Sequence, residues 1–313
     1  MRRGTSAQSL EQDPVVSSRA LSQIVPDLAN FADYAEVDDS NGPMKREWRG
    51  GGVRKRSVMI YGLFQSAQGA AAQSARLDVI ANNLANASTS AFKRQLAVFR
   101  ERAPFDVVNG VSREVPGNLN DSSGGVELDR VAIDFSDGPL SKTGGPFDIA
   151  LSGPGFFRVS DGQRELLTRN GRLTRNSNGD LVMSDTGMGV IGTDGTPIRG
   201  IAEVGAVDIG ADGTIRQTAS DGSRTLIGHL DLVNPLSTDS LVPMGNGVYR
   251  AEGPVESTAD VKVHQGYLEG SGTNSVAEMM QMIQTSRAFE MNLNVMKFQD
   301  EALGQLLQSV ARA

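Results

Sequence analysis

The chain has 313 residues, enough for one or two domains, and a formal net charge of −7 at pH 7. This acidic balance argues against binding to a nucleic-acid backbone as the main role. The absence of Cys excludes disulfides, thiolate catalysis and Cys-ligated zinc, and the presence of only two His argues against a His-based metal site. We expect no cofactor, and no run approaches the roughly 18 apolar residues of a membrane span.

Residues 1–58 differ in character from the rest of the chain. They are rich in Ser, Asp, Arg and Gly, with an acidic patch followed by a basic cluster. Such a segment buries too little apolar surface to offset its ordering entropy, so we predict a disordered extension. The basic cluster could bind nucleic acid or lipid headgroups, but a solvated tail is the simpler interpretation. A further hypothesis is that translation begins at Met59 and that residues 1–58 are not made.

Residues 59–92 are predicted to contain the N-terminal helix of a helical domain. Apolar and small residues recur there at i, i+3, i+4 and i+7, which places them on one helix face. The large apolar side chains of this face are Ile60, Leu63, Phe64, Leu77, Ile80 and Leu84. The Asn-rich run at residues 82–86 is predicted to end the helix, because Asn tolerates the left-handed conformation of a helix terminus.

Residues 93–130 are predicted to form a connector, and residues 131–263 a central antiparallel all-β domain. Eight Asp-Gly or Asn-Gly dipeptides indicate turns, with Gly at positions 138, 162, 171, 179, 195, 213, 222 and 247. The predicted strands between them cover residues 131–135, 147–151, 156–159, 181–183, 207–209, 225–233, 248–250 and 261–263. Because no helical pattern intervenes, a partly closed antiparallel sheet is favoured over βαβ units.

Three features suggest metal or nucleotide binding. Gly187 to Gly192 has the form G-x-G-x-x-G, but the residues that follow cannot form the helix that a dinucleotide site needs. The oxygen-bearing residues from Asn176 fit a calcium loop only partly, because Leu181 stands where the turn needs Gly. His229 lies in a predicted apolar strand and is interpreted as structural. We therefore expect no bound metal or nucleotide.

A serine enzyme is the alternative of another class. Ser90 and Lys93 have the S-x-x-K spacing of penicillin-recognising enzymes, and residues 142–144 spell K-T-G. However, Ser90 follows a predicted helix end, the two motifs are too close together for that fold, and S-D-N is absent. A periplasmic penicillin-recognising enzyme is thus disfavoured.

Residues 264–313 are predicted to contain a long C-terminal helix. The seven-residue series Met282, Phe289, Met296, Leu303 and Val310 is entirely apolar, and its companion series includes Met279, Leu293 and Leu307. This period of 3.5 predicts a coiled-coil-like seam, which the N-terminal helix can complete. Thr273, Asn274 or Ser275 can cap the helix, and Ser275 with Glu278 fits a capping box. The fold class is therefore predicted to be α+β, with paired terminal helices and a central β domain.

The segment ANNLANASTSAFKRQLAVF, residues 81–99, resembles a signature of the bacterial flagellar rod and hook proteins. The matching residues are Asn82, Asn83, Leu84, Ala85, Asn86, Phe92 and Lys93. The family usually has Gly before this Phe, whereas this chain has Ala91. Residues 148–159, 167–171, 266–271 and 282–292 also resemble the family's central strands and C-terminal helix.

This resemblance implies a structural subunit of the flagellar basal-body rod, with the proximal rod favoured and the distal rod as the alternative. Implied partners are other copies, neighbouring rod or hook proteins and the flagellar export apparatus, with neither nucleic acid nor a small-molecule substrate. The predicted assembly interface combines the N-terminal apolar face with Met282, Phe289, Leu293, Met296, Leu303 and Leu307. The terminal helices would order as neighbouring copies supply the missing surface, although a hairpin within one chain is the alternative.

Overall fold

The computed structural model describes residues 53–102, 125–258 and 260–311. For residues 53–61 it describes the helical backbone but not the side chains. Almost all of the predicted N-terminal extension, residues 1–52, lies outside the described residues, as does much of the predicted connector.

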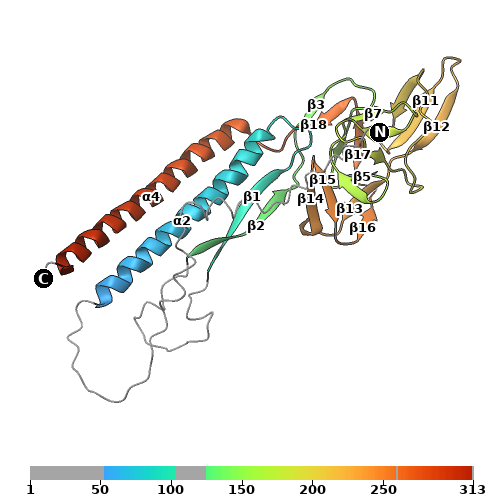
Figure 1. The fold of residues 1–313 in the computed structure, drawn as a ribbon. Helices are drawn as coiled ribbons and strands as arrows, with labels where there is room; N and C mark the ends of the chain where they lie inside the picture. Colours follow the sequence, from blue (N-terminus) through green and yellow to red (C-terminus); the bar gives the residue numbers. More distant parts are fainter. Residues whose placement is uncertain (1–52, 103–124, 259, 312–313) are drawn as a thin grey trace, which may run out of the picture. The chain divides into compact units, whose positions relative to one another are not determined.

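Two long helices lie near the ends of the described chain: α2, Val53–Ala85, and α4, Ser275–Ala311 (Figure 1). Helix α2 begins upstream of Met59, because residues 53–58 contain neither Pro nor Gly and include basic residues that favour helix. It ends within the predicted Asn-rich run, where the Asn86 side chain donates to the Asn82 carbonyl oxygen at 2.9 Å. Among the described residues, neither helix is apolar over a long enough stretch to cross a membrane.

Asn274 caps the start of α4. Its side-chain oxygen accepts from the backbone N–H groups of Val276 and Ala277, at 3.0 and 3.2 Å. This confirms one of the three predicted caps and satisfies two of the orphan donors in the first turn. The predicted capping box is wrong, because the Glu278 carboxylate instead accepts from Arg94, which lies outside the helix.

Helices α2 and α4 lie side by side (Figure 1). A Cβ added at Gly62 would lie 2.9 Å from the Gln299 side chain, and one at Gly69 would lie 3.3 Å from the Asn292 side chain. The residue numbers fall along α4 as they rise along α2, so the helices run antiparallel. The two glycines leave room for these α4 side chains, because glycine contributes no side chain of its own to the contact.

The predicted connector contains a β-hairpin. Strand β1, Arg94–Glu101, pairs antiparallel with β2, Val126–Asp134, from Arg94 opposite Asp134 to Glu101 opposite Val126. The prediction of a plain connector is therefore wrong for these residues. The Pro, Gly and Ser residues between β1 and β2 have the composition of a loop, which led to the prediction of a connector. The β-branched and aromatic residues of β1 form a strand because they pair across to β2.

The remaining strands form antiparallel sheets, as predicted. They are β3 Leu140–Lys142, β4 Ile149–Ser152, β5 Phe156–Ser160, β6 Glu165–Thr168, β7 Leu173–Arg175, β8 Leu181–Met183, β9 Gly189–Val190, β10 Ala206–Ile209, β11 Thr214–Thr218, β12 Arg224–His229, β13 Leu232–Pro235, β14 Leu241–Gly245, β15 Val248–Ala251, β16 Val255–Ser257, β17 Lys262–Gln265 and β18 Tyr267–Glu269. A short 3₁₀ helix, η3, spans Thr238–Ser240. The largest sheet has the order β14-β15-β6-β5-β9-β8-β7, with β13 beside β5 and β16 beside β13.

Two predicted features change in detail. The predicted strand at 225–233 is two strands, β12 and β13, which belong to different sheets. Strands β17 and β18 extend beyond residue 263 and pair with β4 and β3, so the chain returns through the β region before it enters α4. Sequence periodicity cannot show this return, because the partner strands lie more than a hundred residues upstream.

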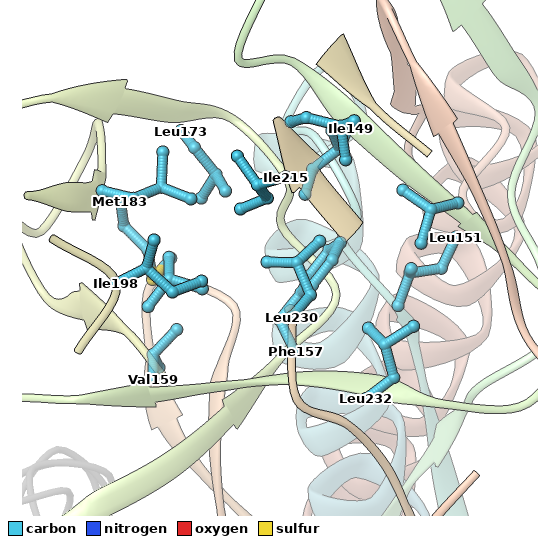
Figure 2. Close-up of a cluster of buried hydrophobic side chains, with 14 of the residues drawn as sticks. Ile149, Leu151, Phe157, Val159, Leu173, Met183, Ile198, Ile215, Leu230 and Leu232 are labelled. Carbon is cyan, nitrogen blue, oxygen red and sulfur yellow. The ribbon is translucent and has the colours of Figure 1, made fainter. Parts of the chain in front are cut away.

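The β domain has a continuous apolar core. Its side chains come from inward-facing positions of many strands and include Ile149, Leu151, Phe157, Val159 and Ile215, each fully buried (Figure 2). Each such side chain stabilises the fold by roughly 1.5–3 kcal/mol. A smaller cluster around Phe156 and Tyr249 includes ring contacts with Phe135, at centroid distances of 5.5 and 5.2 Å.

Acid should weaken the exposed turns at Asp194, Asp212 and Asp221. Hydrogen bonds from Thr196, Thr214 and Ser223 hold the pKa of these carboxyls below their usual value. A depressed folded-state pKa adds stability that is present above the unfolded value and is lost as pH falls through the folded pKa. We expect carboxyl titration by NMR to show that these three groups take up their protons below the ordinary Asp pKa, at a pH below 4. The control Thr196→Val should move only the Asp194 pKa upward, and an unmoved value would contradict the assignment.

Candidate functional site

The structure places the predicted assembly residues in three settings. Ile80 is buried, whereas Phe64 and Leu307 are 43% and 63% exposed. Half-buried residues make up most of the set: Leu63, Leu77, Leu84, Met282, Phe289, Leu293, Met296 and Leu303. Ile60 lies in the part of α2 whose side chains are not described.

The seven-residue series of α4 faces α2 of the same chain. Asn292 and Gln299 approach the α2 glycines, and Phe289, Met296 and Leu303 lie three or four residues from one of them. Residues at that spacing share a helix face. The series therefore has a partner helix within its own chain, and its role between copies stays a prediction.

The Asn-rich motif divides into a buried and an exposed part. Asn83 is buried, and its side chain makes two hydrogen bonds of 2.9 Å with the backbone of Gln95, one to the carbonyl oxygen and one from the N–H. It thereby joins the end of α2 to strand β1. Asn82 is exposed. The fold explains why position 83 is Asn, because a side-chain amide can satisfy a backbone donor and a backbone acceptor at the same time.

Ala91 has a left-handed backbone, with φ of 55°. It is 2% exposed, and its N–H donates to the Glu269 carbonyl oxygen at 2.9 Å. This is the position where the resembling family usually has Gly. A left-handed Ala is tolerated with some strain, since its single methyl group approaches the following carbonyl.

Substitution at Ala91 should separate backbone strain from packing. Ala91→Val should lower the free energy of unfolding by about 2–3 kcal/mol, because a β-branched residue is a poor fit to this conformation and to a buried site. Ala91→Gly should change it by less than about 1 kcal/mol, because relief of strain offsets greater unfolded-state entropy. Chemical denaturation measures both values, and equal losses would contradict the role of φ.

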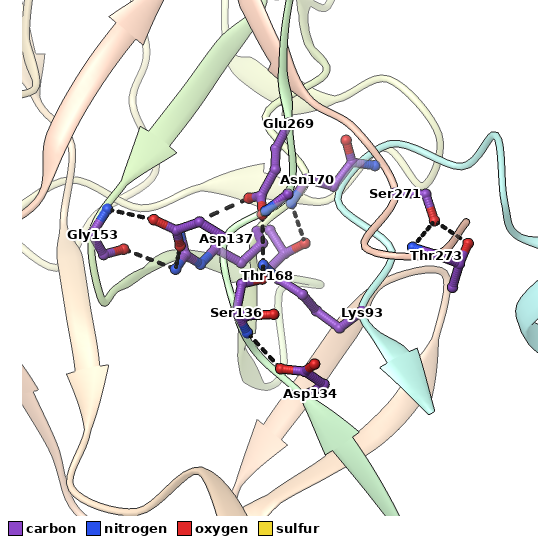
Figure 3. Close-up of polar contacts among 12 residues, drawn as sticks. Lys93, Asp134, Ser136, Asp137, Gly153, Thr168, Asn170, Glu269, Ser271 and Thr273 are labelled. Atoms are coloured by element: carbon purple, nitrogen blue, oxygen red, sulfur yellow. Dashed lines mark hydrogen bonds and ion pairs between the residues drawn. The ribbon is translucent and has the colours of Figure 1, made fainter. Parts of the chain in front are cut away.

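Lys93 forms a buried ion pair. Its Nζ donates to Glu269 Oε1 at 2.5 Å and to the Ser136 carbonyl oxygen at 2.8 Å (Figure 3). Both charged side chains are 1% exposed. Burial lowers the Lys93 pKa below its ordinary value, while the hydrogen bond to Glu269 acts in the opposite direction. Glu269 Oε1 also accepts a hydrogen bond from the Gly138 N–H, at 2.8 Å.

Arg169 extends this cluster. Its Nη2 donates to Asp137 Oδ1 at 3.0 Å and to the Gly153 carbonyl oxygen at 2.8 Å, and its Nη1 lies 3.8 Å from Glu269 Oε2. The guanidinium carbon lies 5.5 Å from the centre of the Phe156 ring. Lys93, Glu269, Arg169 and Asp137 therefore alternate in charge.

A second ion pair ties α4 to the hairpin. Arg94 Nε donates to Glu278 Oε1 at 2.6 Å, and the Glu278 side chain is 1% exposed. Together with Asn83 and Lys93, these contacts join the end of α2, the hairpin, the start of α4 and strand β18. We use the name joint cluster for the seven residues Asn83, Lys93, Arg94, Asp137, Arg169, Glu269 and Glu278. Their contacts can hold these elements in fixed positions.

The sequence found only part of the joint cluster. Asn83 and Lys93 belong to the recognised motif, and Glu278 was predicted to complete a capping box rather than an ion pair. No role was predicted for the side chains of Glu269, Arg169 and Asp137. The available signal was a Glu in the short apolar run that ends at Glu269. Its partner in the sequence could not be identified, because it lies 176 residues away.

The alternative motifs are used structurally. Ser90 lies in a turn after α2, outside any helix, and the Lys93 amine is taken up by Glu269 and Ser136. Gly189 begins a strand, and a turn rather than a helix follows it. Asn176 accepts backbone N–H groups within its own turn, and His229 Nε2 lies 2.7 Å from Thr214 Oγ1. In the described part of the chain, no three His, Asp or Glu side chains are placed to hold a metal ion.

Family models match three separate parts of the chain. A model described as "Flagella basal body rod protein" matches residues 65–93. One described as "Flagellar hook protein FlgE/F/G D1 domain" matches residues 150–217, and one described as "Flagellar basal body rod FlgEFG protein C-terminal" matches residues 264–309. The three matches cover the helix α2 motif, part of the β domain and helix α4.

Several whole proteins are also similar. FlgF of Caulobacter vibrioides is 35% identical over 218 residues, which cover 68% of this chain and 83% of the relative. FlgG of Buchnera aphidicola subsp. Schizaphis graminum is 34% identical over 266 residues, which cover 80% of this chain and 100% of the relative. FlgF of Escherichia coli is 35% identical over 258 residues, covering 78% and 96%. The chain therefore belongs to the flagellar basal-body rod protein family and is a rod subunit of the bacterial flagellum.

Proposed function

We propose that this subunit polymerises through its terminal helices and forms part of the axial drive shaft in the proximal rod. The main support is the apolar surface that α2 and α4 present beyond their mutual contact, which includes Phe298 at 74% exposed. Apolar surface of this kind is stabilised when another chain covers it. The coiled-coil-like character of the helix pair is part of this proposal.

The proposed role is mechanical rather than catalytic. The charged residues of the joint cluster are paired with each other and with backbone groups, which suits a fixed connection between elements. Proposed partners are further copies of this chain, other rod or hook proteins and the flagellar export apparatus. The relatives include rod proteins of two names, FlgF and FlgG, at similar identity, so their names do not single out one position. A position in the distal rod is the second candidate.

The mutation Phe289→Asp tests the role of the helix pair. It places a charge on the half-buried α4 face that contacts α2, and burial of an unpaired charge costs several kcal/mol. We expect α2 and α4 to separate and rods to be absent, while the β domain stays folded. A strain carrying the mutant gene is examined by electron tomography of its basal bodies.

The matched control is Gln308→Asp, which adds the same charge at an exposed position of the same helix. Full-length rods built from the Phe289→Asp protein would refute assembly through this helix pair. Two-dimensional NMR of the purified mutant checks that the β domain signals are retained.

A further inference from the structure

Helix α4 has a second apolar face. Val276, Met280, Ile283, Met291 and Phe298 are 65%, 58%, 54%, 61% and 74% exposed. Their spacings of three, four, seven or eight residues place them together on the side of α4 opposite the face that contacts α2. We call these five residues, with Arg287 in their middle, the outer face of α4. No described element covers it.

Helix α2 has an exposed face of a different shape. Phe64, Ala71, Asp78 and Ala85 recur every seven residues and are all exposed. Ala81 lies beside them and is also exposed. We call these five residues the outer face of α2. Apart from Phe64 its side chains are small, so it is a shallow surface that can receive larger side chains from another helix.

The two outer faces are complementary in charge. Arg287 is the charged residue in the outer face of α4, and Asp78 is the charged residue in the outer face of α2. Among the residues that the structure describes, neither side chain forms an ion pair or a hydrogen bond. Opposite charges across an interface chiefly fix its register and suppress wrong pairings.

We propose that the outer face of α4 in one copy packs on the outer face of α2 in a second copy of this chain, with Arg287 opposite Asp78. This inference rests on the proposed function and specifies its contact surface. An antiparallel alignment on that pair sets Met280 opposite Ala85 and Met291 opposite Ser74. Large side chains then meet small ones along the interface.

The alignment also predicts the form of the assembly. Within one chain, Gln299 is level with Gly62 and Asn292 with Gly69, so paired residue numbers sum to 361. Pairing Arg287 with Asp78 gives a sum of 365, a displacement of four residues, or about 6 Å along the axis. A contact between two different faces with an axial displacement does not close on itself and generates an open helical array.

A symmetric contact between two α4 outer faces fits less well. Centring two antiparallel copies on the middle of this face would place Arg287 against Arg287 and large side chains against large ones. Such a contact is also isologous and closes as a dimer, which does not build a shaft. The observations therefore favour α2 of the next copy as the occupant.

Cysteine cross-linking in the flagellated bacterium tests the contact directly, because the full chain contains no Cys. A chain that carries Met291→Cys and Ser74→Cys should form a covalent ladder of multiples on mild oxidation. The matched control pairs Met291→Cys with Arg76→Cys, an exposed position two residues away on another side of α2. A ladder from the control pair but not from the test pair would overturn the proposal.

Charge exchange provides a second, independent readout. Arg287→Asp and Asp78→Arg should each reduce swimming and the cross-linked ladder, and the double exchange should restore both. Lys297→Asp is a charge reversal on the same helix beside the outer face and should have a smaller effect. Failure of the double exchange to restore the ladder would assign the α4 outer face to another protein.

Two results distinguish a failure of the rod function from a failure of the contact between the outer faces. If deletion of the gene leaves complete basal bodies and normal swimming, the proposed rod function fails. If the rod depends on this chain but the Met291–Ser74 cross-link is absent, only the assignment of the two outer faces fails.

Discussion

Replacing Glu269 by Ala should lower the free energy of unfolding by about 3–5 kcal/mol, because it leaves the buried Lys93 ammonium without its counter-charge. The Lys93 and Glu269 side chains are both 1% exposed, so water cannot readily replace the lost carboxylate. The Gly138 N–H and the Arg169 guanidinium also lose a neighbour. Unfolding of the purified chain in denaturant measures the change in free energy. The transition is monitored through signals from the β domain.

The double variant Lys93→Met with Glu269→Leu is the control. It removes both charges together and keeps similar side-chain volumes, so it should cost less than Glu269→Ala alone. A double variant at least as unstable as the single one would show that the charges are not the reason for the loss. The expected non-additivity is measurable, because the two residues are in direct contact.

The change Gly171→Ala should prevent normal folding of the β domain. An added Cβ would overlap the carbonyl oxygen of Ile149, which belongs to the backbone and cannot turn aside. In the same place the Ile149 N–H donates to the Gly171 carbonyl oxygen at 2.9 Å, so the two segments are held together. We expect a loss of more than about 3 kcal/mol, the upper end of ordinary overpacking. Thermal unfolding and yield of folded protein measure it.

The same substitution at Gly304 is the matched control. Gly304 lies within α4, has ordinary helical φ, and has no atom near an added Cβ. Ala there should stabilise the helix by roughly 0.5–1 kcal/mol, because Gly is a poor helix former. If Gly171→Ala proves as mild as Gly304→Ala, the close approach of the Ile149 backbone is not maintained in solution.

The sequence predicted several elements well because their signals are local. The end of α2 within residues 82–86 and the cap at Asn274 follow from side chains that compete for nearby backbone groups. The strand at residues 181–183 was predicted at its observed limits. At residues 246–247 the Asn-Gly signal corresponds to two positive φ values, 52° and 70°, in the turn between β14 and β15.

Other elements could not be predicted in this way. Strand β1 depends on pairing with β2, and the residues between them carry loop-like composition. Strand β18 looks like the lead-in to a helix until β3 is placed beside it. The joint cluster has the same origin, since Lys93 acquires its partner only when residues far apart in the chain meet.

By itself, the sequence determined the α+β class, the two long helices, the β region between them and the resemblance to rod and hook proteins. These properties follow from periodicity, turn chemistry and short motifs, all of which act over a few residues. Only the tertiary structure decided which face of α4 turns toward α2 and which stays exposed, and which acidic residue balances Lys93. A seven-residue repeat gives a helix an apolar side, but the opposite side can also be apolar, and packing against a particular neighbour determines which one is covered.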